Sequence, residues 1–233
     1  RDELQVQIRN FSDELDSGIA PGSKAFDKIM AEEAAKLIDE IRGTTLDVPK
    51  LIGRGEALEL TERAFNKYPT AWVAKFIETF PEIDVRNVKR GSWLNSPRQP
   101  RPILSVSQNV SRVPGQTNGL ATAIHEVGHG MEDSIPGLSQ MEYAYWQKRA
   151  KGDNNKIQGI FSPRSTSEFG NRDEWREPYS GKSYGLGANS NYEIFTTGVE
   201  SLLGGSGYFG DSTKGFVVDD DFRRFILGVL IGL

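Results

Sequence analysis

Residues 121–132, Ala-Thr-Ala-Ile-His-Glu-Val-Gly-His-Gly-Met-Glu, decide both the fold and the chemistry expected of this chain. The apolar side chains around them repeat at helical spacing, which predicts a helix over Gly119–Asp133. Positions i and i+4 share one helix face, so the imidazoles of His125 and His129 can bind a single metal ion. Glu126 follows the first histidine, where it can take a proton from a water molecule at that ion. This stretch predicts a zinc site with Glu126 as general base.

The alternative is a helix that carries these residues by chance. The chain contains only two histidines, and both occur at metal-ligand spacing. The apolar neighbours of the histidines indicate a buried helix. Gly128 inside that helix suggests close approach by another element, because glycine costs up to about 1 kcal/mol relative to alanine in a helix. These observations favour the metal site.

A catalytic zinc ion usually takes three protein ligands. The chain has no third histidine and no cysteine, so the third ligand must be a carboxylate. Glu193 and Glu200 share one face of a helix expected over Asn191–Leu203. Glu193 is favoured, although Ser190–Glu193 also fits a capping box, in which the glutamate only reaches back to the start of its helix. Glu200 remains the alternative ligand.

Glu132 and Asp133 lie close after His129 in the chain. Either carboxylate can orient an imidazole by a hydrogen bond from outside the ligand set. Exposed acids at a helix end are an equally good interpretation, and the sequence does not decide between the two.

The rest of the chain predicts an α+β fold, with a helical N-terminal portion and a small mixed or antiparallel sheet packed beside the active-site helices. Residues 1–67 would form the helical extension and residues 68–233 the domain that carries the site. Alternation predicts strands over Ile83–Val88 and Ile103–Ser107, the second offering an open edge to an extended peptide. The polar stretch Lys151–Asn191 is expected to form loops. Further helices are expected over Ala25–Arg42, Glu56–Lys67, Thr70–Thr79 and Asp219–Leu233, the last capped by an aspartate.

Composition excludes several classes of function. The chain has 28 basic and 32 acidic residues, and its formal charge of -4 argues against nucleic acid as the main partner. The absence of cysteine excludes disulfides and thiolate metal sites. No apolar run approaches the roughly 20 residues needed to cross a bilayer, so no membrane partner is predicted. The chain starts at Arg1 without a signal-like segment, and its compartment stays open.

Lys182–Gly185 and Asn191–Phe195, with the sequences Lys-Ser-Tyr-Gly and Asn-Tyr-Glu-Ile-Phe, resemble the gluzincin arrangement of the anthrax lethal factor catalytic domain. The resemblance implies that Glu193 is the third zinc ligand. It also implies that Tyr184 is the phenol that stabilises the oxyanion or protonates the leaving group; the simpler alternative is a loop aromatic that packs on the domain. Gluzincins place an acid four residues after the ligand glutamate to brace a histidine. Here Thr197 holds that position, so Glu200 is expected to take the role.

A broader resemblance, over most of the chain after Tyr68, is to the metallopeptidase domain of phage minor head (MuF-type) morphogenesis proteins. It implies a zincin-like fold and a phage head or host protein as partner. The matching pieces are Tyr68–Trp72, Lys89–Gly91, Ile103–Ser105, Thr122–Glu132, Glu177–Lys182 and Phe225–Leu230.

The expected function is that of a zinc-dependent metalloendopeptidase acting on a peptide or protein substrate, with one Zn²⁺ held by His125, His129 and Glu193. The alternative is a non-catalytic head-assembly component in which zinc only holds the fold. Arg164–Ser167 resembles part of an ADP-ribosyltransferase signature. The downstream pair of acids that such chemistry needs does not follow at the required spacing, which disfavours that activity.

Overall fold

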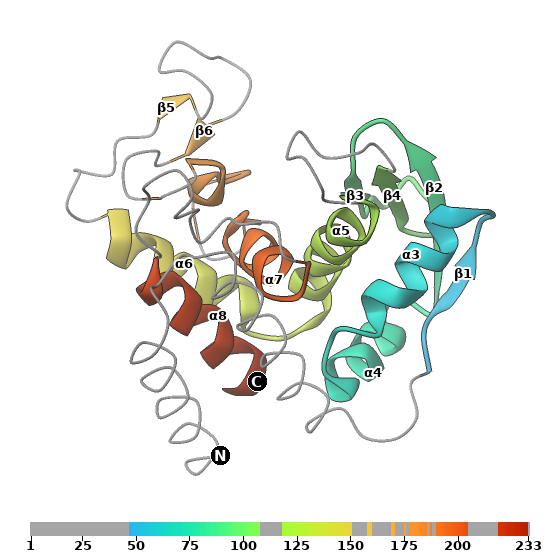
Figure 1. The fold of residues 1–233 in the computed structure, drawn as a ribbon, viewed down its shortest axis with the longest axis horizontal. Helices are drawn as coiled ribbons and strands as arrows, with labels where there is room; N and C mark the ends of the chain where they lie inside the picture. Colours follow the sequence, from blue (N-terminus) through green and yellow to red (C-terminus); the bar gives the residue numbers. More distant parts are fainter. Residues whose placement is uncertain are drawn as a thin grey trace. The chain divides into compact units, whose positions relative to one another are not determined.

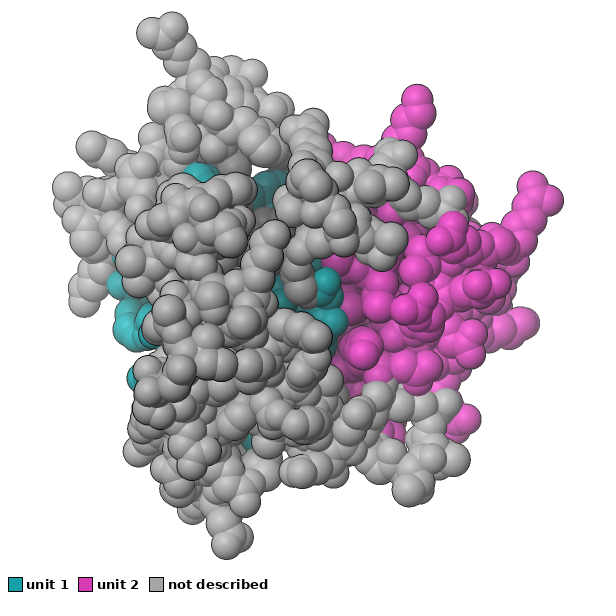
Figure 2. All heavy atoms as spheres, in the orientation of Figure 1, with its two compact units in different colours: residues 1–34, 138–233 teal, residues 35–137 magenta. Residues whose placement is uncertain are grey.

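The computed structural model describes residues 47–107, 118–150, 158–159, 169–170, 175, 178–185, 187, 190–204 and 219–232. These residues belong to two compact units, coloured separately in Figure 2. The sheet unit comprises the described residues up to Gly137, and the helical unit those from Leu138 onward. The described residues form six α-helices and a mixed four-stranded sheet, which confirms the predicted α+β class. The domain boundary at residue 67 stays a prediction, and the helix predicted over Ala25–Arg42 lies outside the described residues.

The sheet has the strand order β1-β2-β4-β3 (Figure 1). Strands β1 (Lys50–Ile52), β2 (Glu82–Val88) and β4 (Ile103–Ser107) are parallel, and β3 (Ser92–Leu94) is antiparallel to β4. β4 is therefore an internal strand with a partner on each side, and all its residues are buried. The expectation that β4 offers an open edge to a peptide is wrong, because the short strand β3 pairs with it.

Three helices complete the sheet unit: α3 (Glu56–Phe65), α4 (Thr70–Thr79) and α5 (Asn118–Ser134). α5 contacts α3, α4 and the strands β3 and β4, so the histidine-bearing helix packs against both the helices and the sheet of its unit (Figure 1). Tyr68, at the break between α3 and α4, is fully buried, and its phenol donates a hydrogen bond of 2.6 Å to the carbonyl of Ile124. This bond anchors α5 one residue before the first histidine.

At Gly130, helix α5 lies very close to its neighbours α4 and β3. A Cβ atom at this position would collide with the ring of Phe76 on α4 and would lie 3.3 Å from Cη2 of Trp93 on β3. The sequence suggested a close approach at Gly128, two residues earlier, and that residue is buried. Because protein interiors are close-packed, the small residue at 130 allows α5 to lie directly on α4 and β3.

The helical unit is built on contacts of α6 with α7 and of α7 with α8. Asp219 caps α8 as expected, since its Oδ1 accepts the N–H of Phe222 at 3.1 Å. None of the described helices is long and apolar enough to span a membrane. The elements of this unit are α6 (Leu138–Ala150), β5 (Gln158–Gly159), β6 (Phe169–Gly170), the 3-10 helix η2 (Pro178–Gly181), α7 (Ile194–Gly204) and α8 (Asp220–Gly232).

The sequence did not predict α6. Its buried face contains Leu138, Tyr145 and Trp146 at helical spacing, but the same face also contains Glu142, which is fully buried. A charged residue in the apolar stripe removes the periodic signal by which an amphipathic helix is recognised.

Candidate metal centre

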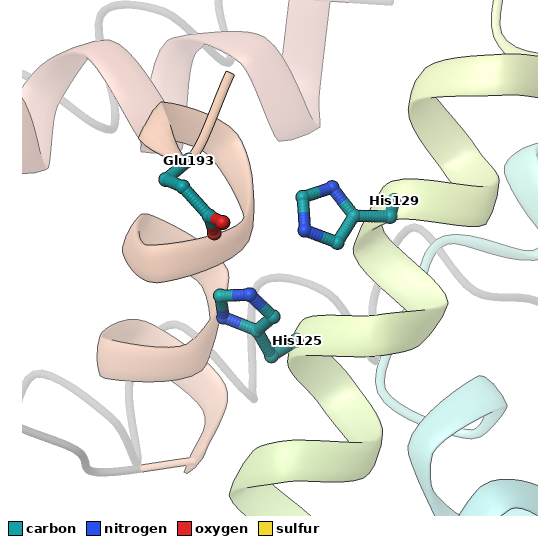
Figure 3. A group of neighbouring side chains, drawn as sticks. All are labelled: His125, His129 and Glu193. Carbon is teal, nitrogen blue, oxygen red and sulfur yellow. The ribbon is translucent and has the colours of Figure 1, made fainter. Parts of the chain in front are cut away.

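The described part of α5 carries His125, Glu126 and His129, as predicted. All three are buried, with exposed fractions of 7% for His125 and 6% for the other two. Glu193, which immediately precedes α7, is fully buried. One potential ligand atom each from His125, His129 and Glu193 lies within 4.8 Å of the others, and Figure 3 shows the three side chains pointing toward one another. Two imidazoles and a carboxylate form a donor set that fits zinc.

Among the described residues, Glu193 rather than Glu200 completes this group. α7 starts at Ile194, and the N–H of Thr197 donates to the carbonyl of Glu193 at 3.0 Å. Glu193 therefore occupies the N-cap position of α7. The capping-box alternative is wrong, because it requires the glutamate to lie three residues inside the helix.

Glu142 of α6 takes over the capping of α7. Its Oε1 accepts a hydrogen bond of 2.8 Å from the backbone N–H of Phe195, in the first turn of α7. A carboxylate at a helix N-terminus satisfies an otherwise unbonded N–H and interacts favourably with the helix dipole. Glu142 thereby helps to hold the start of α7, where Glu193 is located. Sequence reasoning missed this residue, because its partner lies more than fifty positions away.

Four side chains in the described part of the chain donate hydrogen bonds to the carboxylate of Glu193. Its Oε1 accepts from the phenols of Tyr184 at 2.6 Å and Tyr179 at 2.9 Å and from the ammonium of Lys182 at 3.3 Å. Its Oε2 accepts from the hydroxyl of Thr196 at 3.1 Å. A carboxylate oxygen has two lone pairs, so Oε1 is already crowded by donors. Oε2 is the oxygen better suited to a metal ion.

Backbone pairing brings these donors to the glutamate. The N–H of Glu193 donates to the carbonyl of Lys182 at 3.1 Å, and the N–H of Tyr184 donates to the carbonyl of Asn191 at 3.0 Å. Lys182 is consequently held opposite Glu193. Tyr192 precedes Glu193 in the chain, and burial raises the pKa of its phenol. The phenol is therefore neutral at neutral pH. The sequence lacks a strand signal here, so this pairing and the position of Lys182 were not predicted.

Glu132 braces one of the histidines. Its Oε2 lies 2.9 Å from Nδ1 of His129, and both side chains are buried. This was one of the two roles considered for the acids after His129. The other acid, Asp133, accepts the indole N–H of Trp93 at 2.8 Å and so connects α5 to β3. Position 197, where the gluzincin arrangement has a bracing acid, holds a threonine. For His129, that role is taken by Glu132 of α5 itself.

The turn before β3 packs directly against Glu126. A Cβ atom at Gly91 would collide with Oε1 of Glu126 and would lie 2.6 Å from Cγ2 of Thr122. In the sequence, Lys89–Gly91 stands out only by its resemblance to the MuF-type proteins. The structure shows that its glycine leaves the space in which the proposed general base lies.

Comparison of the chain with protein-family models, curated proteins and solved structures gives no match. Function is therefore inferred from the residues of the site. The Arg164–Ser167 segment, considered for ADP-ribosyltransferase chemistry, lies outside the described residues.

Proposed function

We propose that the chain is a zinc-dependent peptidase of the gluzincin type, in which His125, His129 and Glu193 bind one Zn²⁺. The observation that supports this proposal is the convergence of two imidazoles and one buried carboxylate, with ligand atoms within 4.8 Å of one another. Three protein ligands of this kind leave a coordination position open, as a catalytic zinc site requires. The zincin-like fold and the phage or prophage setting belong to the same proposal, supported by the resemblance in sequence.

The residues around this group have the chemistry of peptide hydrolysis. Zinc bound there would activate a water molecule and polarise the scissile carbonyl. Glu126 follows His125 on the same helix, and its carboxylate takes the proton of the attacking water and passes it to the leaving amine. Tyr184 is 60% exposed, while its hydroxyl is held at Glu193. During the reaction this phenol turns its O–H from Glu193 to the oxygen of the substrate on which negative charge develops.

Metal content tests the ligand set. Mass spectrometry of the purified chain is expected to find about one zinc per chain, as a three-ligand catalytic site implies. Glu193→Ala is expected to lose the zinc. Glu200→Ala, prepared identically, is the matched control and is expected to keep it. A wild-type chain that takes up no zinc would contradict the proposal.

Activity tests the chemistry. The zinc-loaded chain is expected to cut members of a panel of unfolded proteins and peptides, and Glu126→Gln is expected to keep its zinc and lose cleavage. A wild-type chain that binds zinc and is stabilised by it, yet cuts nothing in the panel, would support the alternative of a head-assembly component with a structural zinc.

A further inference from the structure

A buried lysine lies beside the proposed metal ligand. Lys182 is 3% exposed, and its Nζ is 3.3 Å from Oε1 of Glu193. The same ammonium donates hydrogen bonds to the hydroxyls of Tyr184 at 2.8 Å and Tyr179 at 3.4 Å, and it lies over both rings. Lysine is almost never buried to this extent unless it is paired. The proposed mechanism uses neither this ammonium nor its charge.

We infer that Lys182 is an internal counter-ion of Glu193, which stabilises the metal-free protein and thereby weakens its affinity for zinc. The inference rests on the proposed function, because it takes Glu193 to be a zinc ligand. It adds a property of the site: a lysine and a metal ion compete for the same carboxylate.

In the protein without zinc, Lys182 and Glu193 form a buried ion pair. The side chains of Lys182 and Glu193 are 4% and 0% exposed, so each would be costly as an isolated charge. Removing one partner of a buried ion pair leaves the other charge uncompensated and is strongly destabilising. Lys182 therefore makes a large contribution to the stability of the metal-free protein.

The balance of charges would change in the zinc-loaded protein. Zinc held by Glu193 would itself compensate the carboxylate, so the ammonium is no longer needed for that purpose. Instead, the ammonium and the metal are like charges close together at a buried site, where solvent screens their repulsion poorly. Lys182 thus stabilises the metal-free protein more than the loaded one. By linkage, removal of its charge must raise the affinity for zinc.

An opposite effect would arise if Lys182 were needed to orient the carboxylate for the metal. The structure supplies other donors for that task. Tyr179 and Tyr184 hold Oε1, and Thr196 donates to Oε2. Orientation of Glu193 therefore does not depend on the lysine alone. The charge of Lys182 then decides whether its removal raises or lowers the affinity for zinc.

The test is Lys182→Gln, which removes the charge and keeps a side-chain N–H donor. Zinc affinity is measured by competition with a chelating dye, and thermal unfolding is followed with and without zinc. The variant is expected to bind zinc at least about tenfold more tightly than wild type. The reason is that loss of the buried ion pair destabilises the metal-free protein, whereas in the zinc-bound protein the metal compensates Glu193. It is also expected to unfold at a lower temperature without zinc and to gain more from zinc than wild type does.

Two further variants make the result specific. Lys50→Gln removes the ammonium of an exposed pair with Glu82, whose atoms are 2.7 Å apart, and it is expected to leave zinc affinity unchanged. Lys182→Arg keeps the positive charge and is expected to bind zinc about as weakly as wild type. Zinc binding by Lys182→Arg as tight as that of Lys182→Gln would overturn the inference.

The outcomes separate this inference from the proposed function. If wild type binds zinc and Lys182→Gln binds it equally or more weakly, Lys182 is not a competing counter-ion. A Lys182→Gln protein that folds only with zinc supports the inference, and one that stays unfolded at saturating zinc overturns it. If wild type binds no zinc, the proposed function fails, and the competition with zinc fails with it. The counter-ion pairing is then decided by whether Lys182→Gln costs less stability in a Glu193→Gln background.

Discussion

Oε2 of Glu132 lies 2.9 Å from Nδ1 of His129, one helical turn away on α5, and both groups are buried. With Nδ1 engaged by the carboxylate, Nε2 is the nitrogen of this imidazole that remains for a metal ion. An i, i+3 separation on a helix places such a pair in contact without help from any other element. The brace of His129 is therefore built into the same helix as the ligand itself.

Replacing this brace is expected to weaken zinc binding. Glu132→Ala should lower zinc affinity about 10- to 100-fold, because the imidazole loses the acceptor that fixes its orientation and raises its basicity. Competition with a chelator measures the effect. Asp133→Ala is the control: it removes the neighbouring acid, which accepts from Trp93 and Asn95, and should leave zinc affinity close to wild type. Equal affinities for Glu132→Ala and wild type would contradict the brace.

Tyr184 and Tyr179 offer a matched pair of phenols, since both donate to Oε1 of Glu193. If the Tyr184 hydroxyl turns from Glu193 to donate to the developing oxyanion, Tyr184→Phe should lower kcat by about 10²-fold while zinc stays bound. Tyr179→Phe should have a much smaller effect on kcat. Steady-state kinetics with metal analysis of both variants distinguishes the roles. Similar losses in the two variants would mean that the phenols only hold the ligand carboxylate.

Gly91 is expected to control the position of Glu126. Gly91→Ala would force the carboxylate aside, and a displacement of about 1 Å can lower turnover on the order of 10²-fold without loss of zinc. Turnover and metal content are the measurements. Gly228→Ala on α8 is the control, because a Cβ there meets nothing within 4 Å. It should keep activity and gain roughly 0.5–1 kcal/mol of stability.

A stability measurement tests the same contact without any assay of activity. Glu126→Asp shortens the side chain that the new Cβ would strike. Gly91→Ala should therefore cost less free energy of unfolding in the Glu126→Asp background than in wild type. The same cost in both backgrounds would show that the collision is relieved elsewhere, for example at Thr122.

Glu142 is expected to be a major source of stability for the helical unit. Glu142→Ala removes the acceptor of the buried N–H of Phe195 and should cost about 1.5–3 kcal/mol, as for other hydrogen bonds to a charged group. Glu142→Gln keeps an acceptor oxygen and should cost less. Denaturant unfolding measures both. If both variants match wild type, another group caps α7.

Tyr68 anchors α5 through the carbonyl of Ile124. Tyr68→Phe keeps the ring and removes the hydroxyl, so it should lower the free energy of unfolding by about 0.5–1.5 kcal/mol. Tyr143→Phe is the control, since its hydroxyl takes part in a surface hydrogen bond with Gln147. An equal effect of the two substitutions would argue against a special role for Tyr68.

The sequence by itself determined the elements whose signal is local. The predicted helix Gly119–Asp133 matches α5, Thr70–Thr79 matches α4, and Ile103–Ser107 matches β4. The prediction that His125 and His129 bind one metal ion also rests on a local signal, because the geometry of a single helix places residues i and i+4 on one face. Elimination of other ligand types, and the resemblance to gluzincins, pointed further to Glu193.

Only the tertiary structure decided which residues lie against the site. Strand β3 has three residues and takes its form from pairing with β4, so its own sequence predicts little. Lys182 opposite Glu193 and Gly91 against Glu126 each depend on the packing of segments separated in the chain. Spacing along one element is set by backbone geometry and can be read from a sequence. Contacts between elements are set by the packing of many side chains at once, and these contacts determine what surrounds the ligands.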